Sequence, residues 1–121
     1  MSRVVGYRSL RAWELGMQLT EAVYELAGRL PADERFGLAS QMKRAAASVP
    51  LNLAEGYGRG GREFARFIGI AYGSLLELET AIELARRVGM IDGAADLDRR
   101  TAEVGKVLNG LRKSVLANDS K

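Results

Sequence analysis

Arginine and lysine side chains are the residues of this chain best suited to chemistry, because guanidinium and ammonium groups contact phosphates. The sequence holds 18 basic and 15 acidic residues, a net charge of +3. The surplus gathers in residues 40–66, where Glu55 and Glu63 are the two acids. The candidate cations in and just before this segment are Arg35, Lys43, Arg44, Arg59, Arg62 and Arg66. Their clustering weakly favours an acidic or nucleic-acid partner.

Other kinds of chemistry find little support in the composition. Histidine and cysteine are absent, which removes the commonest general base and the usual transition-metal ligands. Glu77, Glu79 and Glu83 follow one another, but dimetal sites in helical bundles usually also use a Glu-x-x-His motif. We therefore predict no catalytic residue, no metal and no cofactor.

The length of 121 residues suits a single domain covering residues 1–121, with a loose arm at 1–9 and a frayed tail at 117–121. The N-terminus lacks the continuous apolar core of a signal peptide. No charge-free run approaches the roughly 20 residues of a membrane span. We expect a cytoplasmic protein without a membrane partner.

Apolar residues recur at intervals of three and four, which predicts helices over residues 10–30, 34–57, 62–88 and 94–116. Short connections between them favour an all-α, antiparallel, up-down-up-down four-helix bundle. In the first helix, Met17 and Tyr24 fall on the predicted apolar face. Pro50 lies inside the second helix and predicts a kink there.

Two glycine patterns occur near the predicted third helix, one just before it and one within it. Residues 56–61 read GYGRGG and formally match a dinucleotide-binding fingerprint, but a helix rather than a strand precedes them. A helix end followed by a turn is the better interpretation. Gly69 and Gly73 accompany surplus apolar residues on the third helix, which predicts deep burial or a subunit interface.

A row of polar residues lies along one face of the second helix at spacings of three and four. Its members are Gln41, Arg44, Ser48, Asn52 and Glu55. In an arbitrary helix, such a row is most often a solvated face.

The middle of the chain resembles a known family. The motif positions are Phe36-Gly37-Leu38, Ser40-Gln41, Arg44-Ala45-Ala46, Ser48-Val49-Pro50, Asn52-Leu53-Ala54-Glu55-Gly56, Glu63-Phe64, Gly73-Ser74-Leu75 and Glu77-Leu78-Glu79-Thr80. They resemble the bacterial four-helix bundle proteins, which include the large-subunit ribosomal RNA intervening-sequence proteins. This family is related to the accessory variability proteins of diversity-generating retroelements. The resemblance covers roughly residues 7 to 91.

The resemblance implies a four-helix bundle that assembles as a homo-oligomer, a ring of five subunits with a central channel. The retroelement relatives bind nucleic acid and a reverse transcriptase, so both are implied partners. Beside the family motif, Gln41, Ser48, Asn52 and Glu55 are better interpreted as a hydrogen-bonded structural network around the Pro50 kink. Contact with a ligand or nucleic acid, or plain solvation, remain the alternatives for this row.

Three functions are considered from these patterns and from the resemblance, which is the source of the reverse-transcriptase link. The first is a non-enzymatic, oligomeric nucleic-acid-binding protein that contacts RNA or an RNA-DNA hybrid through phosphates, as an accessory to a reverse transcriptase. Its candidate residues are the six cations named above together with Arg86, Arg87, Arg112 and Lys113. The second is a protein-interaction scaffold that binds no nucleic acid. The third, an enzyme, is disfavoured by the composition.

Overall fold

The computed structural model describes residues 6–119. A short 3-10 segment, η1 (Gly6–Ser9), precedes α1 (Arg11–Ala27), and a second one, η2 (Ala32–Glu34), precedes α2 (Leu38–Arg59). The chain continues through α3 (Gly61–Arg87) and α4 (Ala95–Asp119). Within residues 6–119 there are four α-helices and no strand, so the predicted all-α four-helix fold is confirmed.

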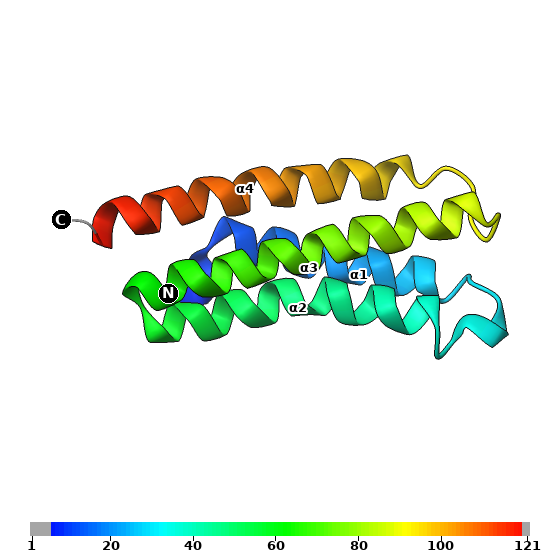
Figure 1. Cartoon of the computed structure of the whole chain (residues 1–121), viewed down its shortest axis with the longest axis horizontal. Helices are drawn as coiled ribbons and strands as arrows, with labels where there is room; N and C mark the ends of the chain where they lie inside the picture. Colours follow the sequence, from blue (N-terminus) through cyan, green and yellow to red (C-terminus); the bar gives the residue numbers. More distant parts are fainter. Residues whose placement is uncertain (1–5, 120–121) are drawn as a thin grey trace, which may run out of the picture.

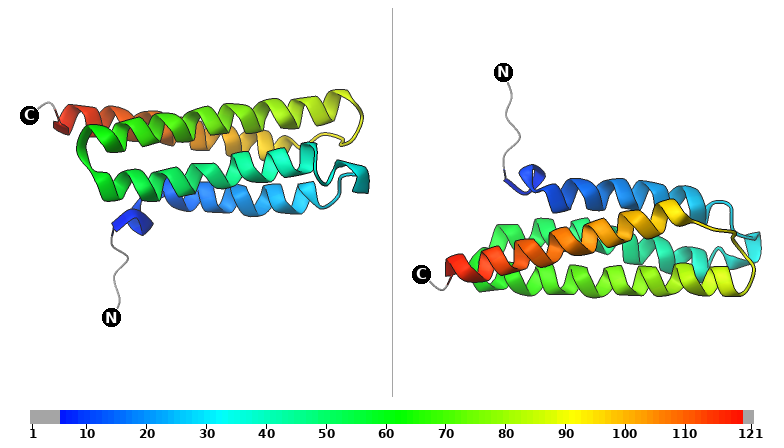
Figure 2. Two further views of the ribbon diagram at one scale, coloured as in Figure 1. Left: turned by 60° about the horizontal axis from the view of Figure 1, so that its bottom comes forward. Right: turned by 90° about the horizontal axis from the view of Figure 1, so that it is seen from above.

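The helices lie side by side, and each connection turns the chain back along the bundle (Figure 1). The helices α1 and α2, α2 and α3, α3 and α4, and α4 and α1 pack on one another as neighbours. The contact between α2 and α3 is the most extensive, and that between α1 and α4 is the least. Figure 2 shows η1 beside the C-terminal part of α2.

The ends of the chain are more regular than the sequence suggested. Within the predicted arm, residues 6–9 form η1, while residues 1–5 lie outside the described part. Within the predicted tail, residues 117–119 belong to α4, which continues through Asp119. Residues 120–121 lie outside the described part. Helical periodicity alone did not reveal these extensions, since the terminal turns carry few apolar residues.

The core is a continuous apolar cluster to which all four helices contribute. Its largest fully buried side chains are Leu19, Val23, Met42, Val49, Leu53, Ile68, Leu75, Leu78, Ile82, Val104 and Leu108. Met17 and Tyr24 are 37% and 53% exposed, so their predicted place on the buried face of α1 is wrong. The buried stripe of α1 instead follows Ala12, Gly16, Leu19 and Val23.

Pro50 is buried inside α2, which runs without interruption from Leu38 to Arg59. Proline has no N–H, so the carbonyl of Ala46, four residues earlier, loses its helical donor. The hydroxyl of Thr20 in α1 lies 3.1 Å from that carbonyl oxygen and 2.7 Å from the carbonyl of Gly16. Its single hydrogen is therefore shared between the two carbonyls. The kink itself stays a prediction.

Two glycines permit the closest approaches between helices. A Cβ atom at Gly16 would lie 3.2 Å from Cγ1 of Val49 in α2. One at Gly56 would lie 2.5 Å from the Cβ of Phe67 in α3, too close for any side chain. Gly56 thus serves helix packing, while Gly60, at φ +72°, supports the turn between α2 and α3. At Gly73, by contrast, an added Cβ would meet nothing within 4 Å.

Candidate nucleic-acid interface

The candidate cations near the junction of α2 and α3 are bound to carboxylates. Arg59 lies 3.0 Å from Glu55, and Arg66 lies 3.0 Å from Glu63. The two residues of each pair are three or four positions apart in the same helix, which is about one helical turn. Arg62 reaches across the bundle to Asp119 at the end of α4, at 3.2 Å. The charge surplus predicted for this segment is therefore largely compensated where α2 and α3 meet.

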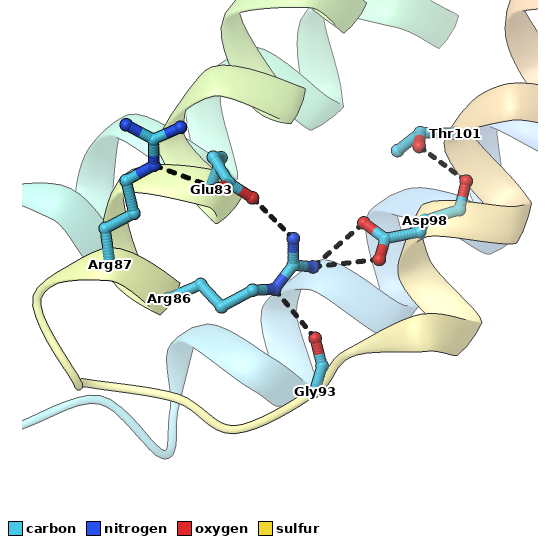
Figure 3. Close-up of polar contacts among 6 residues, drawn as sticks. All are labelled: Glu83, Arg86, Arg87, Gly93, Asp98 and Thr101. Carbon is cyan, nitrogen blue, oxygen red and sulfur yellow. Dashed lines mark hydrogen bonds and ion pairs between the residues drawn. The ribbon is translucent and has the colours of Figure 1, made fainter.

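Arg86 contacts residues on both sides of the corner between α3 and α4 (Figure 3). Its Nη2 lies 2.9 Å from Asp98 in α4, and its Nε donates to the carbonyl of Gly93 at 2.9 Å. Its Nη1 contacts Glu83 at 2.7 Å, and Arg87 contacts the other oxygen of Glu83 at 3.1 Å. The Arg86 side chain is 28% exposed, and its guanidinium group is engaged by the contacts at this corner.

Ion pairing also shifts the titration of these acids. Hydrogen bonds from Arg87 and then Arg86 lower the pKa of Glu83 below its ordinary value. A hydrogen bond from Arg66 likewise lowers the pKa of Glu63. Because the folded-state pKa values are lowered, these pairs contribute stability above the unfolded-state pKa and lose it as the pH falls through the folded-state pKa. At neutral pH the carboxylates stay charged and continue to mask the arginines.

The other five candidates have no carboxylate within salt-bridge distance among residues 6–119; they are Arg35, Lys43, Arg44, Arg112 and Lys113. Two of them lie over aromatic rings instead. The guanidinium of Arg35 is 4.8 Å from the ring centre of Phe36, and the ammonium of Lys43 is 5.4 Å from that of Tyr24. Arg44, Arg112 and Lys113 are exposed. The ten candidates therefore separate into compensated and uncompensated cations.

Sequence reasoning missed a second group of cations, where α1 faces α4. A surface groove of about 630 Å³ lies there, and its basic lining residues are Arg11, Arg99, Arg100 and Lys106. Its acidic lining residues are Asp96 and Glu103. One sequence signal could have found part of this group. Lys106 and Arg99 lie seven and fourteen residues before Lys113, which was already a candidate, and residues seven apart lie on nearly the same helix face.

The structure brings together part of the polar row of α2. The hydroxyls of Ser48 and Ser74, from α2 and α3, lie 2.7 Å apart, and the amide of Asn52 donates to Ser48 Oγ at 2.8 Å. Gln41 and Arg44 line a small hollow beside Ser48 and Ser74. Glu55 lies apart from them, where it pairs with Arg59. The observed network thus joins α2 to α3. The Ala46 carbonyl, which lacks a helical donor because of Pro50, instead accepts a hydrogen bond from Thr20 in α1.

An apolar surface remains uncovered along α3. Leu76 and Leu84 are 46% and 49% exposed. Together with Leu38 and Gly73 they line a groove of about 550 Å³ between α3 and the start of α2. Neighbouring copies of this chain could bury this surface, which keeps the subunit-interface interpretation of the third helix in place.

None of the helices formed by residues 6–119 is both long and apolar enough to cross a membrane. The same residues contain no group of three or more acidic side chains that could hold a metal ion. A family model described as 23S rRNA-intervening sequence protein matches residues 8–110 of the chain. No curated protein matches its sequence.

Proposed function

The chain belongs to the 23S rRNA-intervening sequence protein family, and we propose that it is a non-enzymatic, homo-oligomeric protein that binds RNA through phosphates. The observation that carries this proposal is the set of exposed cations of α4 that have no carboxylate partner among residues 6–119, namely Lys106, Arg112 and Lys113. A cation that is already paired must give up a carboxylate to bind a phosphate, whereas an unpaired one gives up only water and counterions.

Assembly strengthens the binding proposal. A single subunit has a net charge of only +3, but a ring of five subunits, which the family resemblance implies, repeats each cation five times. Phosphate contacts on several subunits act together once one of them has formed, because the others then bind at a high effective concentration. The exposed apolar surface of α3 is the proposed contact between subunits.

A protein-interaction scaffold is the alternative function, and it is favoured by the five of the ten candidate cations that are already bound to carboxylates. Under this alternative, the basic surface contacts an acidic protein instead of RNA. The reverse transcriptase implied by the resemblance is a protein partner compatible with either function. Copurification of the chain with such an enzyme, before and after ribonuclease treatment, separates a direct contact from one carried by RNA.

A salt series tests RNA binding. Fluorescence anisotropy of the purified protein with a labelled RNA hairpin and a labelled unstructured RNA is measured between about 50 and 300 mM KCl. Phosphate-directed binding predicts a linear fall of log affinity with log salt, with a slope of about 0.7–0.9 for each phosphate contacted. No binding of either RNA at the lowest salt contradicts the proposal and favours the scaffold. Intact RNA after prolonged incubation is the result expected of a protein without catalysis.

A further inference from the structure

We propose that RNA phosphates are bound on the outer face of α4 and in the groove between α4 and α1. This inference rests on the proposed RNA binding and names the surface that carries it. The defining residues are Arg99, Lys106 and Lys113, which we call the α4 row, and Arg11 and Arg100, which line the groove beside it.

The geometry of α4 places the row on its most exposed side. The buried residues of α4 include Leu97, Val104 and Leu108, and the row lies on the opposite side of the helix by the 3.6-residue period. Arg99, Lys106 and Lys113 are all exposed. Seven residues correspond to a rise of about 10 Å, so the row extends over about 21 Å of the helix surface. This is long enough to meet several phosphates of one RNA strand.

The groove lies between α1 and α4, the two neighbouring helices with the least extensive contact in the bundle. Its charges do not balance, since four cations face two carboxylates. Asp96 is shared between Arg99 and Arg100, and lies 2.9 Å from the latter. Arg11 forms an ion pair with Glu103 at 3.2 Å, and Lys106 has no carboxylate within salt-bridge distance among residues 6–119. The excess positive charge is therefore local and belongs to one continuous surface.

The uncompensated cations at the start of α2 are less suited to this role. Arg35 and Lys43 already contact the rings of Phe36 and Tyr24. Arg44 lines a hollow that also contains Glu77. These cations follow no common row, whereas the α4 row repeats at a constant interval.

The lining also defines the kind of recognition. Lysine ammonium groups act as point charges that can bind a phosphate from many directions, and the arginine guanidinium groups add paired hydrogen-bond donors. The groove is completed by Ala102 and Val107 and has no aromatic lining residue on which a base could stack. The surface therefore fits a phosphate backbone and gives little discrimination among base sequences.

Two triple variants with the same change in net charge test the inference. The first, Arg99→Gln with Lys106→Gln and Lys113→Gln, removes the α4 row. The second, Arg35→Gln with Lys43→Gln and Arg44→Gln, removes the α2 group and serves as the matched control. Both replace exposed or half-exposed side chains, and thermal unfolding followed by circular dichroism checks that each variant folds. Lys106→Gln alone is the fallback if the first triple variant does not fold.

RNA affinity of the α4-row variant is expected to fall by about tenfold or more at low salt, and its salt slope by about 2. The Lys106→Gln variant is expected to lower the slope by about 0.7–1. The control is expected to change affinity by less than about threefold. Equal losses in the two triple variants, or a larger loss in the control, overturn the inference but leave RNA binding in place. Failure of the unmodified protein to bind RNA overturns both proposals.

Discussion

At the scale of single residues, the hydroxyl of Thr20 has the most specific task in the described structure. Pro50 leaves the carbonyl of Ala46 without a helical donor, and a buried carbonyl without a hydrogen bond is costly. Thr20 supplies a hydrogen from the neighbouring helix at an oxygen-to-oxygen distance of 3.1 Å. The proline of α2 is therefore compatible with the core because of a residue in α1.

Thr20→Val tests this compensation, because valine keeps the shape of threonine and removes the hydroxyl. We expect the free energy of unfolding to fall by about 1–2 kcal/mol, the usual cost of a lost hydrogen bond to a buried group. Urea unfolding followed by circular dichroism measures it. Thr20→Ser retains the hydroxyl and serves as the control, with a smaller expected loss. Equal stability of the valine variant and the unmodified protein would show that the carbonyl of Ala46 does not depend on Thr20.

At the scale of helices, Gly56 controls the contact between α2 and α3. These two helices form the most extensive contact in the bundle, and an added Cβ at Gly56 would overlap Phe67 at 2.5 Å. Gly58 lies in the same helix, but an added Cβ there would meet nothing within 4 Å. The two positions lie two residues apart in one helix, with Gly56 buried against α3 and Gly58 exposed.

Gly56→Ala is expected to lower the free energy of unfolding by about 1–3 kcal/mol, because the helices must separate or shift to admit the methyl group. Gly58→Ala is expected to leave stability unchanged or raise it by up to about 1 kcal/mol, since alanine favours the helix. Chemical denaturation of both variants gives the comparison. A Gly56→Ala variant as stable as Gly58→Ala would refute the close approach of α2 and α3.

At the scale of the whole molecule, charge and apolar surface lie on different elements. The cations of the α4 row, of which Lys106 and Lys113 have no carboxylate partner among residues 6–119, are exposed on α4, while the exposed leucines line α3. Separate surfaces allow one to hold RNA while the other joins subunits. A change to the α3 surface should therefore alter the oligomeric mass without altering the fold of the subunit.

Leu76→Glu combined with Leu84→Glu is expected to convert the proposed oligomer to monomers, because charged side chains in an apolar contact lose their hydration. Light scattering coupled to gel filtration measures the mass, and circular dichroism measures the helix content. Leu51→Glu, at a leucine that is 67% exposed on α2, provides the control. An unmodified protein that is already monomeric, or a double variant with unchanged mass, would argue against the α3 interface.

The sequence by itself determined the number of helices, their approximate limits and most of the core, because a period of 3.6 residues is a local property. The interval of seven between Arg99, Lys106 and Lys113 was equally readable, although its importance was not apparent without the groove. The tertiary structure decided which charges are available. Arg62 is paired with Asp119, 57 positions later in the chain, and Arg86 with Asp98 across a corner. Such pairings depend on how the helices pack, and no local periodicity encodes them.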